Sequence, residues 1–141
     1  MLCGRVTDAS PIIACAAYYH QWNRKDFDRL AHACVAGHLI ECSTYVTGGN
    51  FSGFKSLPGS LVDIGFPIGE ISPEGDFVVT LQEGNDGQVT VDTCKAQLLY
   101  EIQGPDYYNP DVVAILDDIV FEQEAPNRVY VPLPGLKRSV L

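Results

Sequence analysis

Apolar residues recur every three or four positions between residues 26 and 42, which is the spacing of one face of a helix. A shorter segment, residues 11–20, is apolar almost all round, and this predicts a buried helix with Ser10 as its N-cap. A third helix is expected over residues 90–102, because polar capping residues open it and a Gly-Pro pair follows it. The chain therefore contains three predicted helices.

Elsewhere the pattern changes to extended segments that are separated by turns containing glycine or proline. These segments are residues 44–46, 66–72, 76–82, 112–114, 115–124 and 128–131. Short turns join 66–72 to 76–82 and 115–124 to 128–131, so β-hairpins are predicted in the second half. Helices and strands together predict an α/β fold with a mixed sheet.

The start of the chain has the pattern of an incomplete β-strand followed by a helix. Residues 1–8 run from apolar positions into a loop, and the first predicted helix begins directly after it. A strand, a loop and a buried helix form the repeating unit of α/β proteins. We therefore expect a fragment of a larger α/β domain, with residues 1–131 forming its folded part and residues 132–141 a tail.

Charge and cysteine content narrow the function classes. The 141 residues carry 9 basic and 18 acidic side chains, a net charge of −9. Residues 63–124 hold 14 acidic side chains against one basic side chain, Lys95, and such a surface repels nucleic acid.

Five cysteines without C-x-x-C spacing, and no signal peptide, predict reduced thiols and a cytoplasmic location. No apolar run approaches the ~20 residues of a membrane span.

The first candidate site lies at the end of the second predicted helix. His38 and Glu41 are three residues apart and therefore share a helix face. Histidine titrates near neutrality, so the pair suits proton transfer or hydrogen bonding to a substrate. Metal binding is the weaker alternative, because a zinc site needs three or four ligands and no second close pair exists. The plain alternative is helix packing with Glu41 in solvent.

A glycine-rich loop follows, and it is the second candidate site. Thr47, Gly48, Gly49 and Asn50 place two glycines among polar residues, and such loops present backbone N–H groups to phosphate or carboxylate ligands. The sequence matches neither the P-loop nor the dinucleotide-binding fingerprint. A tight loop required by chain geometry alone is the competing interpretation.

Two further candidates are supported by their positions. Arg5 and Asp8 flank a loop expected at the carboxyl end of a strand, where ligands bind in open α/β sheets. A local salt bridge or a helix cap is the alternative for this pair. Asp92 opens the third predicted helix between Thr90 and Thr93, which suggests either an anion site or, more simply, a cap.

Several segments of the sequence resemble the N-terminal domain of the acyclic terpene utilisation proteins, the AtuA-like family. They occur in the family's order and cover most of residues 3–131. The matching segments are residues 3–10, 36–42, 46–54, 65–68, 89–93, 96–107 and 109–112. Arg5, Asp8, His38, Glu41, Gly48, Gly49, Asn50, Asp92 and Glu101 all lie in these motifs.

The resemblance implies a link to bacterial catabolism of citronellol and geraniol, in which acyl-CoA thioesters are the intermediates. It indicates a pathway without indicating a reaction or a cofactor. Family members are several times longer and have an α/β region before the first motif, so the resemblance also implies a fragment. Three interpretations stay open: an enzyme segment acting on a branched acyl or acyl-CoA substrate, a non-catalytic binding or assembly module, and an inactive truncated product. A second copy or a partner chain that supplies the missing part is expected in the second case.

Overall fold

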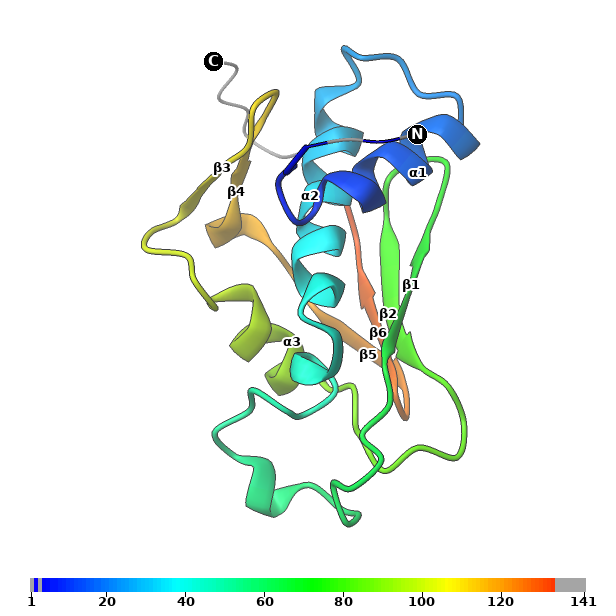
Figure 1. Cartoon of the computed structure of the whole chain (residues 1–141), viewed down its shortest axis with the longest axis vertical. Helices are drawn as coiled ribbons and strands as arrows, with labels where there is room; N and C mark the ends of the chain where they lie inside the picture. Colours follow the sequence, from blue (N-terminus) through cyan, green and yellow to red (C-terminus); the bar gives the residue numbers. More distant parts are fainter. Residues whose placement is uncertain (1, 3, 134–141) are drawn as a thin grey trace.

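Helix α2 (Phe27–Glu41) lies at the centre of the fold in the computed structural model, which describes residues 2 and 4–133. Figure 1 shows α2 running along one face of a sheet, with α1 (Ser10–Tyr19) and α3 (Val91–Leu98) beside it. Every residue from Leu30 to Leu39 is buried. A helix that is covered on all sides is a core element. The amphipathic pattern of the sequence predicted burial of one face only, whereas the structure buries the whole middle of the helix.

The main sheet has four strands in the order β1-β2-β6-β5, and all its pairings are antiparallel. A second sheet pairs β3 with β4, also antiparallel. The α/β class and both predicted hairpins, β1–β2 and β5–β6, are confirmed. The strands are β1 (Pro67–Ile71), β2 (Phe77–Leu81), β3 (Asp106–Tyr108), β4 (Val113–Ile115), β5 (Glu122–Ala125) and β6 (Arg128–Val131).

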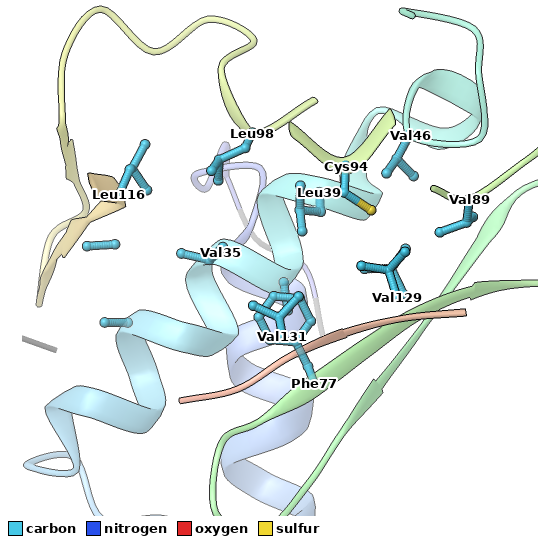
Figure 2. Close-up of a cluster of buried hydrophobic side chains, with 14 of the residues drawn as sticks. Val35, Leu39, Val46, Phe77, Val89, Cys94, Leu98, Leu116, Val129 and Val131 are labelled. Atoms are coloured by element: carbon cyan, nitrogen blue, oxygen red, sulfur yellow. The ribbon is translucent and has the colours of Figure 1, made fainter. Parts of the chain in front are cut away.

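The hydrophobic core lies between α2 and the inner face of the sheet (Figure 2). Phe77 and Val79 of β2 and Val129 of β6 point inward, because alternate residues of a strand face the same side. They meet Val35 and Leu39 of α2, and all five side chains are at most 1% exposed. Full burial of each such side chain contributes roughly 1.5–3 kcal/mol.

Two buried histidines connect α2 to its neighbours through hydrogen bonds. His32 Nδ1 lies 3.1 Å from the carbonyl oxygen of Gly75 in the β1–β2 turn. His38 Nε2 lies 3.2 Å from the carbonyl oxygen of Leu98 at the end of α3. In each ring the other nitrogen is buried and has no hydrogen-bond partner. Burying an unpaired polar atom is costly, so both rings depend on the packing around α2.

The N-terminal loop lies directly against α2. Ala9 is fully buried, and a Cβ atom added to Gly37 would lie 2.8 Å from the Cβ of Ala9. Only a residue without a side chain therefore fits at position 37. Ala9 is also the N-cap residue of α1, so the prediction of Ser10 as N-cap is wrong by one position. The amide of Ser10 donates to the carbonyl oxygen of Thr7 and closes the turn before the helix.

Two predictions about the first half of the chain are wrong. The strand expected at residues 44–46 is part of a 3₁₀ helix, Ser43–Tyr45, because Ser43 has a φ of 50° and the amide of Gly49 donates back to Thr44. Helix α1 is not buried: only Ala16 is buried, since the helix packs along one side of α2. Apolar composition alone does not show which elements cover a helix.

Other boundaries differ from the prediction as well. Residues 2 and 4–9 contain no strand, so within the described residues no strand precedes the loop of residues 5–8. Helix α3 stops at Leu98, and Glu101 beyond it has a φ of 63°, which an α-helix cannot accommodate. A 3₁₀ helix, Leu116–Asp118, interrupts the long segment predicted before β5.

The predicted tail begins with packed residues. Pro132 and Leu133 are half-buried, and the amide of Leu133 donates to the Asp76 carboxylate at 2.6 Å. This hydrogen bond connects the end of β6 to the β1–β2 turn. Residues 134–141, the remainder of the predicted tail, lie outside the described residues.

Replacing Gly37 by alanine tests the contact between Ala9 and α2. Alanine ordinarily stabilises a helix interior by about 1 kcal/mol relative to glycine. Here its methyl group would overlap Ala9, and overpacking costs about 1–3 kcal/mol. We expect Gly37→Ala to lower the free energy of unfolding by about 1 kcal/mol net, measured by urea denaturation. Gly104→Ala is the control, because nothing lies within 4 Å of its added Cβ. A Gly37→Ala protein as stable as the parent would contradict the contact.

Candidate functional site

A pocket of about 600 Å³ lies where the N-terminal loop meets the start of α1 and the end of α2. Arg5 and Asp8 come from the loop, and Glu41 comes from the last turn of α2. These three residues, predicted separately from the sequence, are therefore brought together. The remaining wall is formed by Val6, Thr7, Pro11, Ile12 and Cys42.

Glu41 is the most perturbed acid of this pocket. Its side chain is only 10% exposed. Burial, together with the negative charges of Asp8 and Glu101, raises the pKa of Glu41 to about 6, while Arg5 acts in the opposite direction. The Arg5 guanidinium lies 3.2 Å from the Asp8 carboxylate, and this pair is largely exposed. The Glu41 carboxyl group therefore exchanges its proton near neutral pH.

His38 lies behind Glu41 and does not line the pocket. Its Nδ1 is 3.5 Å from Oε1 of Glu41, too far for a strong hydrogen bond but within range of an electrostatic interaction. Because the carbonyl oxygen of Leu98 only accepts, Nε2 carries the proton and Nδ1 directs its lone pair toward Glu41. Burial lowers the pKa of His38, so the ring is neutral at pH 7.

Two residues from the second half of the chain hold His38 in place. The Gln97 side chain of α3 donates to the backbone carbonyl of His38 at 3.3 Å. The Tyr107 ring of β3 lies over the imidazole with 5.0 Å between ring centroids. Burial raises the pKa of Tyr107 to about 12, so its phenol stays protonated. Sequence reasoning missed Tyr107, because β3 has three residues and gives little alternation signal.

The glycine-rich loop does not present its amides to a ligand. The N–H groups of Gly48 and Asn50 donate to the Tyr45 carbonyl, and that of Gly49 donates to the Thr44 carbonyl. Thr47 is fully buried, and its hydroxyl donates to the Thr44 and Gly65 carbonyls. An anion at these amides would have to displace hydrogen bonds that the loop already makes.

Asp92 lies outside the pocket, exposed in the first turn of α3. Thr90 is the N-cap of that helix and forms a capping box with Thr93, so Asp92 is not needed as the cap. Of the residues predicted from sequence, Arg5, Asp8, His38 and Glu41 thus form one cluster. Asp92 and the four loop residues are not part of it.

Over residues 2 and 4–133, no group of three or more His, Cys, Asp or Glu side chains is placed to hold a metal ion. In the same part of the chain, no helix combines the length and the apolar character needed to cross a bilayer.

The fold and site define an α/β protein with a carboxyl pair beside a buried histidine. The chain belongs to the acyclic terpene utilisation family AtuA, whose family model matches residues 1–135. The resemblance found in the sequence motifs is therefore confirmed. No curated protein and no solved structure matches the chain.

Removing the charge of Asp8 should shift the titration of Glu41. In Asp8→Asn, the negative charge that favours the protonated form is lost, so the pKa of Glu41 should fall from about 6 toward 4.5. It should not reach that value, because burial, the larger cause, remains. Carbon-13 NMR of the side-chain carboxyl groups measures the shift. Asp92→Asn, on the distant helix, should leave Glu41 unchanged, and an equal effect of both variants would contradict the geometry.

Removing the Tyr107 ring should expose His38 to water. Burial is the main cause of the lowered His38 pKa, so Tyr107→Leu should raise that pKa toward its ordinary value of 6.5. Tyr107→Phe keeps the ring and should leave the pKa unchanged. Proton NMR titration of the histidine ring signals distinguishes the two variants. If both variants behave like the parent, the Tyr107 ring does not shield His38.

Proposed function

We propose that this pocket is a proton-transfer site that acts on a branched acyl or acyl-CoA substrate, with Glu41 as its acid–base group. The observation that carries the proposal is the position of Glu41: a nearly buried carboxyl group on the pocket wall, beside a second carboxyl group, with a pKa raised to about 6. Membership of the acyclic terpene utilisation family supports the choice of a branched acyl substrate.

The environment of Glu41 suits it both to donate and to accept a proton. A group with a pKa near the working pH is a good donor when protonated and a good acceptor when ionised. Asp8 favours the protonated form of Glu41, while its own charge is compensated by Arg5. Glu41 would take a proton from the carbon next to a carbonyl group, or deliver one to a carbon–carbon double bond. These are the proton steps of hydration, dehydration and lyase reactions.

His38 would act on Glu41 and not on the substrate, because it does not line the pocket. Its neutral ring and its Nδ1 lone pair face Oε1 of Glu41, and Nε2 is held by Leu98. The lone pair favours the protonated carboxyl group electrostatically. His38 is therefore a positioning residue in this proposal, and Glu41 is the catalytic residue.

Exchange of substrate protons with solvent deuterium tests the proposal. The protein is incubated in D₂O with a branched acyl-CoA thioester, and deuterium incorporation beside the carbonyl group is followed by mass spectrometry. Incorporation by the parent should rise with pH through about 6 as the Glu41 carboxylate forms. General acid–base catalysis typically contributes 10²–10⁴-fold, so Glu41→Gln should reduce the rate by about that factor.

The controls separate the chemical role of Glu41 from folding. Asp92→Asn should exchange at the parental rate, and the urea denaturation midpoint of Glu41→Gln should show that this variant is folded. A folded Glu41→Gln variant with parental exchange would overturn the assignment of Glu41. Absence of exchange by the parent with branched thioesters would overturn the proposed substrate class.

A further inference from the structure

A second pocket adjoins the first, and the two share a wall. It measures about 480 Å³ and lies between α1 and β1. Ile12 of α1 lines both pockets, so the two adjoin at this side chain. Ile40 of α2 and Ile71 of β1 form much of its surface, with Tyr18 and Tyr19 at its rim.

This second pocket is free of charged side chains. No Asp, Glu, Lys or Arg lines it. Its imidazole, that of His20, lies with Nε2 2.9 Å from the carbonyl oxygen of Ile71 and is stacked on Trp22. Such a surface gains from binding hydrocarbon, at about 0.8 kcal/mol for each buried CH₂ group, which corresponds to roughly fourfold in affinity.

The charge of the first pocket disfavours an anionic head group. Its only cation, Arg5, is already paired with Asp8. The charge of Glu41 is only partly offset by Arg5, and Glu101 adds a further negative charge that acts on it. A carboxylate ligand would meet these charges, whereas a hydroxyl or carbonyl group would meet hydrogen-bonding partners. A carboxyl group that exchanges its proton near neutral pH donates to a carbonyl when protonated and accepts from a hydroxyl when ionised.

We propose that the two pockets hold a single uncharged amphipathic ligand, an aliphatic alcohol, ester or thioester, and select against the free carboxylate. The hydroxyl or carbonyl head lies at Glu41 and Asp8. The aliphatic chain passes Ile12 and lies between Ile40 and Ile71. The proposal rests on the proposed function only for the placement of the head at Glu41. In an acyl-CoA substrate, the anionic phosphates would lie outside both pockets.

The test uses three molecules that share a straight six-carbon chain: hexanol, methyl hexanoate and hexanoate. Each is titrated at pH 6, where Glu41 is present in both protonation states, into protein labelled at the isoleucine methyl groups. NMR shifts report the site and the affinity. Hexanol and methyl hexanoate should shift Ile12, Ile40 and Ile71 and bind about tenfold more tightly than hexanoate, since one uncompensated charge in a partly buried site costs about a pKa unit or more. Butanol should bind more weakly than hexanol, by on the order of tenfold for two CH₂ groups.

Two variants make the result specific. Glu41→Gln removes the opposing charge, so it should narrow the gap between hexanol and hexanoate. Ile12→Glu places a charge on the half-buried shared wall and should abolish hexanol binding, and the denaturation midpoint checks that this variant is folded. Hexanoate that binds as tightly as hexanol, or depends on Arg5 in an Arg5→Gln variant, would overturn the inference. Shifts confined to residues outside both pockets would also overturn it.

The outcomes separate this inference from the proposed function. Hexanol has no proton beside a carbonyl group and cannot undergo the exchange reaction. Its binding can therefore be measured whether or not Glu41 catalyses exchange. Selective hexanol binding together with failed deuterium exchange would refute only the proposed reaction. Exchange together with a preference for hexanoate would refute only the inference about ligand charge.

Discussion

The structure depends on a helix that is covered on every side. Because α2 is buried from Leu30 to Leu39, each neighbouring element must approach its backbone closely. One such approach is that of Ala9 to Gly37, where a side chain on the helix would not fit. This contact fixes where the N-terminal loop lies. It therefore fixes Asp8 beside Glu41, one turn further along the same helix, and creates the carboxyl pair.

The electrostatics of the pocket follow from this packing. A carboxyl group at the end of a surface helix would titrate at its ordinary pKa, but Glu41 is shielded by the loop and faces another carboxyl group. Behind Glu41, α3 and β3 exclude water from His38. The Leu98 carbonyl and the Tyr107 ring hold the imidazole in one orientation. Ile12 of α1 lines both the polar pocket and the apolar one, so the two pockets adjoin at this side chain. The proposed proton transfer at Glu41 and the proposed shape of the ligand therefore depend on the same packing of loop and helix.

The sequence allowed part of this site to be predicted, and the physical reason differs from residue to residue. The i, i+3 spacing of His38 and Glu41 places them on one helix face wherever the helix packs. Their closeness to Asp8 depends on Ala9 and Gly37, which no local pattern reveals. Glycines at positions 48 and 49 indicated a tight loop, but not that its amides donate inward. The strand carrying Tyr107 was too short to show a period.

The arrangement of the site depends on the packing of the N-terminal loop on α2 through Ala9 and Gly37. The most direct measurement is the nuclear Overhauser effect between the methyl protons of Ala9 and the α-protons of Gly37 in isotope-labelled protein. A strong signal is expected, because a Cβ atom added to Gly37 would lie 2.8 Å from the Cβ and 3.0 Å from the Cα of Ala9. Absence of that signal in folded protein, with the other α2 contacts present, would show that the loop does not pack on α2 at Gly37 and that Asp8 is not held beside Glu41.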